Sequence, residues 1–99
     1  MKKGVLEMCI LKIISQGDLY GYEIMKAVTE AFPEMNESTV YAVLRRLYSD
    51  GLTQCYSGSV SGGPTRKYYR ITAEGIDELQ KMLDEWKSTL NSLKKLGVE

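Results

Sequence analysis

The middle third of the chain combines basic, aromatic and hydroxyl side chains in a pattern that suits contact with a polyanion. Tyr41 and Arg45 lie one helical turn apart in sequence, and a second group, Arg66 to Tyr68, follows about twenty residues later. Arginine and lysine donate charge-assisted hydrogen bonds to phosphates, and tyrosine adds a hydroxyl donor or a stacking ring. The pattern predicts nucleic-acid binding. The alternative for Tyr41, packing on a helix surface without touching DNA, stays open.

The distribution of charge is more informative than its total. The chain has a net charge of zero, yet residues 36–71 carry five basic residues against two acidic ones, a balance of +3. The flanking segments, residues 1–35 and 72–99, have balances of −1 and −2. This concentration favours a local anion-binding surface, although charge alone does not exclude a random scatter.

Missing residue types exclude several classes of protein. The chain contains no histidine, which excludes His-based acid–base catalysis and the usual zinc sites. Cys9 and Cys55 lie far apart without a CxxC motif, so we expect structural thiols in a cytoplasmic protein. The longest apolar run, Met8–Leu11, is too short to span a membrane. We therefore expect no enzyme activity, no metal, no cofactor and no membrane partner.

Three helices are expected in the first half of the chain, over about 5–16, 20–32 and 36–50. The third helix has Asn36 as its expected N-cap and Gly51 as the glycine that ends it. One of its faces is apolar, with Val40, Val43, Leu44 and Leu47. The opposite face is small, polar and basic, with Ser38, Tyr41, Ala42, Arg45 and Ser49. A helix that enters a DNA groove needs such a face.

A β-hairpin is expected after the third helix. Residues 52–57 and 65–71 alternate in the manner of strands, and the polar, glycine-rich link 58–64 joins them. Alternation places Tyr69 and Ile71 opposite Tyr68 and Arg70, so we expect Tyr69 and Ile71 to anchor the hairpin to the core.

The last segment predicts a long helix from Thr72 towards Leu96. Its apolar residues recur at alternating spacings of three and four, which is the seam of a coiled coil. A helix of this span is roughly 35 Å long, more than the remaining domain covers. We expect it to pair with a second subunit; the alternative is a helix folded back on its own domain.

The first helix is apolar on more than one side, so a second face of it either meets the partner or is covered by its own domain. The predicted dimer interface comprises Met8, Leu11, Leu79, Leu83, Trp86, Leu90 and Leu93.

The order of elements predicts a mainly α fold with a two-stranded β-hairpin. Three helices, a hairpin and a long helix form a winged helix-turn-helix in residues 1–71, followed by a C-terminal dimerisation helix in 72–99, as one continuous unit. In this arrangement the third helix enters the major groove and the hairpin reaches the adjacent backbone or minor groove. A winged-helix module that binds proteins rather than DNA is the alternative.

Four stretches of the chain resemble the PadR-like transcriptional regulators, specifically the short members with one C-terminal helix. They are GYEI at 21–24, ESTVYAVLRRL at 37–47, DGL at 50–52 and GPTRKYYRITAEG at 63–75. The resemblance covers essentially the whole chain, and its specificity comes from the helix motif and the later PTRKYY motif at a fixed distance. It implies a homodimer that represses transcription from an operator with two half-sites.

The resemblance also implies roles for individual residues. Tyr41 and Arg45 would lie on the recognition helix, and Arg66, Lys67 and Tyr68 in the wing. Ser38 and Thr39, at the start of the same helix, complete the expected DNA-binding set. Many relatives have Gly or Ala where this chain has Ser38, so the operator sequence does not follow from the family.

Trp86 is the residue that we expect to take part in regulation. It is the only tryptophan and lies in the middle of the apolar seam. In some relatives a tryptophan at this place lines a pore between subunits that accepts planar aromatic compounds. The resemblance implies a small aromatic effector that binds near Trp86 and weakens operator binding; packing at the interface alone is the alternative.

Overall fold

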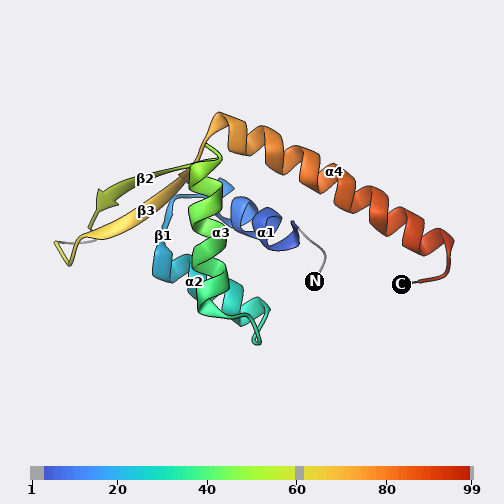
Figure 1. The fold of residues 1–99 in the computed structure, drawn as a ribbon, viewed down its shortest axis with the longest axis horizontal. Coiled ribbons are helices and arrows are strands. Elements are labelled where there is room, and N and C mark those ends of the chain that lie inside the picture. The colour runs from blue at the N-terminus through green and yellow to red at the C-terminus, as the bar shows by residue number, and fades with distance from the viewer. Residues whose placement is uncertain (1–3, 60–61, 99) are drawn as a thin grey trace.

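The structure is a computed structural model that describes residues 4–59 and 62–98, and this part of the chain forms four helices and three strands (Figure 1). In chain order they are α1 (Val5–Ser15), β1 (Leu19–Tyr20), α2 (Gly21–Ala31), α3 (Glu37–Ser49), β2 (Thr53–Gly58), β3 (Arg66–Ile71) and α4 (Ala73–Lys95). The mainly α fold with a hairpin between the third and fourth helices is confirmed. Residues 60 and 61 of the predicted link lie outside the described residues.

The predicted helix caps fix the ends of the helices. Asn36 Oδ1 accepts a hydrogen bond from the backbone N–H of Ser38 at 2.8 Å, and Thr72 Oγ1 accepts one from Gly75 N–H at 3.0 Å. Gly51 has a φ of 76°, a left-handed conformation that favours glycine and ends α3. These polar contacts satisfy backbone groups that a helix end leaves without partners, so α3 and α4 begin at the predicted residues.

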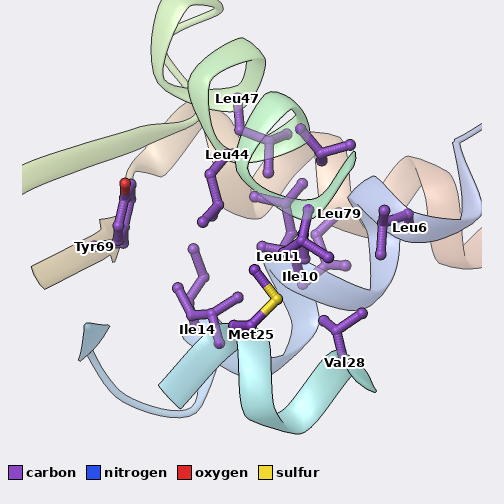
Figure 2. Packing of buried hydrophobic residues seen from close by; sticks show 13 residues of the cluster. Leu6, Ile10, Leu11, Ile14, Met25, Val28, Leu44, Leu47, Tyr69 and Leu79 are labelled. Carbon is purple, nitrogen blue, oxygen red and sulfur yellow. The ribbon is translucent and has the colours of Figure 1, made fainter. Parts of the chain in front are cut away.

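α1 lies at the centre of the core and is buried on two sides. Figure 2 shows Leu6, Ile10, Leu11 and Ile14 among side chains from α2, α3, β3 and α4. The structure corrects the expectation that Leu11 faces a second subunit, because its side chain is 0% exposed within a single chain. The domain itself covers this second face of α1, while Met8 is half-buried.

The sheet contains one strand more than the predicted hairpin. β1 pairs antiparallel with β3, with Leu19 opposite Tyr69 and Tyr20 opposite Tyr68, so the strand order is β1-β3-β2. The expectation that the second helix starts at Tyr20 is thereby corrected by one residue. β1 has only two residues, too few for a pattern of alternation, and it forms because β3 offers it a free edge. The third strand ties the hairpin to the helices.

The hairpin and α4 extend from the helical core in opposite directions (Figure 1). The first part of α4 packs on the core: Leu79 is buried there, and Met82 and Leu83 are partly buried. Leu79 therefore belongs to the domain's own core rather than to an outer surface. Further along α4, Leu90 and Leu93 are exposed. No helix in the described ranges is long and apolar enough to cross a membrane.

Candidate nucleic-acid interface

α3 divides into a buried face and an exposed face, as its spacing predicts. Val40, Val43, Leu44 and Leu47 are buried in the core. Ser38, Thr39, Tyr41 and Arg45 are exposed. The residues expected to contact DNA on this helix therefore lie on the side that is open to a ligand.

The first turn of α3 is held by its cap. The Ser38 hydroxyl donates to Asn36 Oδ1 at 2.5 Å, and the Thr39 N–H donates to the Asn36 carbonyl at 3.1 Å. The oxygen of Ser38 keeps its lone pairs for a donor from outside, such as the amino group of a base. The cap thus fixes the position of Ser38 while leaving it able to accept a hydrogen bond.

Tyr41 lies where α3 passes the beginning of α2. Its Cε1 atom would be 3.5 Å from a Cβ placed on Gly21, so the ring edge rests close to the backbone there. The ring is still 40% exposed. The core side of Tyr41 is thereby positioned by contact, and its other side remains open to a ligand.

The two adjacent arginines of α3 have different surroundings. Arg46 forms an ion pair with Glu7 of α1. Among the described residues, Arg45 has no carboxylate oxygen within ion-pair distance. The sequence predicts that one of the two is an ordinary surface charge but not which one; the pairing with Glu7 identifies Arg46, which leaves Arg45 for a ligand.

The residues expected in the wing, which we define as β2 and β3 with their connection, lie on two faces of the sheet. Tyr69 is buried against the helices, and Lys67 shares its face by alternation. We call this the inner face. Arg66 and Tyr68 lie on the opposite, outer face. The structure therefore does not bring the three expected wing residues together.

A row of tyrosines crosses the outer face from strand to strand. The Tyr20 and Tyr68 rings meet edge to face at 5.6 Å, and the Tyr56 and Tyr68 rings stack at 5.5 Å between centroids. Arg66 Cζ lies 5.0 Å from the centroid of Tyr20. Such contacts of arginine with aromatic rings fix the guanidinium over the ring face while its N–H groups remain available to an anion.

Asp18, just before β1, binds two side chains of the outer face, Tyr56 of β2 and Arg70 of β3. The Tyr56 hydroxyl donates to Asp18 Oδ2 at 2.6 Å, and Arg70 Nε donates to the same oxygen at 3.2 Å. The hydrogen bond to Asp18 raises the pKa of Tyr56 above its usual range. Sequence reasoning missed Asp18 because its partners are more than thirty residues away and no short motif marks them. Arg70, with its charge already paired, serves to hold the wing.

Lys67 lies on the inner face, towards α3. Its Nζ atom is 5.9 Å from the Tyr48 ring centroid and 5.6 Å from that of Tyr69. Burial raises the pKa of Tyr69, and the nearby Lys67 charge opposes that rise. The ammonium group is therefore placed between the recognition helix and the wing rather than beside Arg66.

Trp86 is half-buried and lines a cleft between α1 and α4. The cleft has a volume of about 180 Å³ and is lined by Gly4, Val5, Met8, Glu78, Met82, Glu85 and Trp86. The lining combines apolar side chains with two carboxylates, those of Glu78 and Glu85. Such a site suits a flat, positively charged group.

Cys9 and Cys55 are free, half-buried thiols. Burial raises the pKa of both, and the charge of Lys67 partly offsets the rise for Cys55. A raised thiol pKa lowers the thiolate fraction at neutral pH, which fits the expected structural role. Within residues 4–59 and 62–98 no three potential ligand side chains come together in a way that could hold a metal ion.

The chain matches the transcriptional regulator PadR-like family over residues 10–81. A PadR-like transcriptional regulator from Bacillus cereus is 37% identical, with 95% of this chain and 92% of that chain covered and a TM-score of 0.87. A PadR family transcription regulator from Clostridium difficile is 35% identical over 94% of this chain and 98% of that one, with a TM-score of 0.85. An uncharacterized protein of Lysinibacillus sphaericus is 40% identical over 87 residues, which are 85% of this chain and 80% of that protein.

Proposed function

Because the chain belongs to the PadR-like family of transcriptional regulators, we propose that it is a sequence-specific repressor of an operator with two half-sites. Members of this family are DNA-binding regulators that act as dimers, not enzymes. The observation that carries the proposal is the contrast on α3, where Arg46 is paired with Glu7 and Arg45 is exposed beside Tyr41. α3 would enter the major groove, with Ser38, Thr39, Tyr41 and Arg45 towards the bases.

The wing would contact the same duplex with its cationic side chains. Arg66 and Tyr68 on the outer face would contact the minor groove and its flanking phosphates, and Lys67 on the inner face would contact the backbone. We propose that residues 1–71 bind DNA and that 72–99 pair the subunits. The protein would act in the cytoplasm, where a bacterial regulator meets its operator.

The two arginines of α3 provide a matched test of this proposal. Arg45→Gln and Arg46→Gln remove the same charge from neighbouring positions, so any general effect of charge is equal. In gel-shift titrations with the DNA upstream of the protein's gene, we expect Arg45→Gln to weaken binding by about tenfold or more, as loss of a base contact does. We expect Arg46→Gln to leave the affinity nearly unchanged.

A scrambled duplex and a second salt concentration complete the experiment. Specific binding should exceed binding to the scrambled duplex, and both should weaken as salt rises because counterions are released. Equal losses for the two arginine variants would contradict the assignment of α3 to base recognition. No binding by the unaltered protein at low salt would overturn the DNA-binding proposal and favour a protein partner.

We further propose that a planar aromatic cation binds at Trp86 and releases the operator. The cleft of about 180 Å³ is small for a drug-sized molecule, which fits half of a site that a second subunit completes. α1 lines this cleft with Val5 and Met8. α1 also packs against α3 in the core and carries Glu7, the partner of Arg46, so a displaced α1 would move the recognition helix.

Fluorescence of the single tryptophan tests the effector site. Planar aromatic cations should quench the Trp86 fluorescence in a saturable manner. Glu85→Gln should weaken the binding of a cation more than the binding of a neutral ring of the same size. Quenching by none of a panel of such cations would contradict the proposal. If Glu85→Gln weakens the binding of cationic and neutral rings equally, Glu85 has no electrostatic role in the site.

A further inference from the structure

A groove runs between the second half of α3 and strand β3. It has a volume of about 250 Å³ and is lined by Leu44, Arg45, Tyr48, Ser49, Lys67 and Tyr69. Leu44 and the ring of Tyr69 are buried and form its floor. Tyr48, Ser49 and Lys67 are exposed at its walls. The groove is thus a shallow, open site with polar groups around an apolar base.

The groups around this groove fit an anion. Two of the lining side chains, Arg45 and Lys67, are cations, and none is a carboxylate. No ion pair neutralises Arg45 or Lys67 within the described residues. The Tyr48 and Tyr69 rings hold the Lys67 ammonium between the helix and the wing. Tyr48 and Ser49 add hydroxyl donors, which lie on a helix face that the domain does not use for packing.

The position of the groove indicates which anion it meets. A winged helix places its recognition helix in the major groove and its wing at the neighbouring minor groove. One sugar–phosphate strand separates these two grooves of the duplex. The wing side of this groove, where Lys67 lies, therefore faces that strand and not a base edge, since base edges are presented inside the grooves.

We infer that this groove binds a single phosphate of the DNA backbone, with the Lys67 ammonium as its principal charge and the Ser49 and Tyr48 hydroxyls as donors. The inference rests on the proposed function and deepens it. It assigns Tyr48, which the sequence does not single out, to the interface, and it gives Ser49, on the polar face of α3, a phosphate as its partner. It also separates Lys67 from Arg66, because the two neighbours would contact the duplex from opposite faces of the sheet.

Lys67→Met tests the charge, because methionine keeps a long apolar side chain over the tyrosine rings. Binding should weaken by about tenfold for the operator and by a similar factor for a scrambled duplex, since a phosphate carries no sequence information. The slope of log affinity against log salt should fall by about one. Ser49→Ala, at an exposed position, should produce a smaller loss of the same kind. Lys87→Met removes the same charge from α4, far from this groove, and should change neither quantity.

Operators that carry one neutral methylphosphonate locate the contact. At one backbone position the neutral linkage should weaken operator binding by the unaltered protein but should weaken binding by the Lys67→Met variant little further. If every neutral linkage lowers the affinity of the Lys67→Met variant as much as that of the unaltered protein, the inference is overturned. It is also overturned if Lys67→Met weakens binding to the operator but not to the scrambled duplex. If the unaltered protein distinguishes the two duplexes while these results fail, the proposed function stands and only the phosphate site falls. If it binds neither duplex, both fall.

Discussion

The exposed part of α4 supplies a quantitative prediction about subunit pairing. Leu90 and Leu93 lie on the predicted seam but retain 38% and 37% exposure in the single chain. Full burial of a leucine contributes about 2 kcal/mol, so the remaining area of each is worth about 0.8 kcal/mol. Four such side chains, two from each subunit, give about 3 kcal/mol. The double substitution Leu90→Gln and Leu93→Gln should therefore raise the dimer Kd by about a hundredfold.

Sedimentation equilibrium over a range of protein concentrations measures this shift. Glutamine is a good helix former, so α4 should remain helical by circular dichroism. Asn91→Gln, at an exposed position of the same helix, is the matched control and should leave the Kd unchanged. Operator binding should weaken with dimer loss, since both half-sites must be held together. An unchanged Kd for the double variant would refute the seam as the interface and favour an α4 that serves only its own domain.

Two further predictions concern the domain itself. A Cβ at Gly75 would overlap the carbonyl oxygen of Leu52, so Gly75→Ala should lower the free energy of unfolding by about 2–3 kcal/mol in urea titrations. Gly17 has open space around it, so Gly17→Ala should not destabilise the protein. Equal effects of the two substitutions would refute the packing argument. The hydrogen bond to Asp18 raises the pKa of Tyr56, so the folded state keeps the phenolic proton to a higher pH than the unfolded state does. The contribution of this bond to the free energy of unfolding is therefore present below about pH 10 and is lost as pH rises through the raised pKa. Urea titrations of Tyr56→Phe should show a smaller decline in stability above about pH 10 than the unaltered protein, and an identical decline would contradict the role of this hydrogen bond.

Local patterns predicted the elements because their determinants are local. Asn36, Gly51 and Thr72 cap the helices where the sequence places them, since each acts on backbone groups only a few residues away. The apolar stripe of α3 was predicted for the same reason. The burial of Leu11 was not, because a helix that is apolar on two sides gives no sign of what covers the second side.

The candidate site was predicted as a list of residues but not as an arrangement. Alternation separates Lys67 from Arg66, yet the meaning of that separation depends on β1, a strand with no sequence signature, and on α3 lying against the inner face. Likewise, Glu7 decides which of two adjacent arginines is available to a ligand, from a position in another helix. In each case the deciding contact joins segments far apart in the chain.

These long-range contacts also explain why charge counting is a weak guide here. Of the five basic residues between 36 and 71, Arg46 and Arg70 are paired with carboxylates that lie outside that segment. The remaining three are Arg45 and Lys67, which line the groove between α3 and β3, and Arg66 on the outer face of the wing. Three unpaired cations are too few to hold a polyanion by bulk attraction alone. The surface must meet phosphates and bases at defined positions, so its affinity should depend on the geometry of the duplex more than on the net charge of the protein.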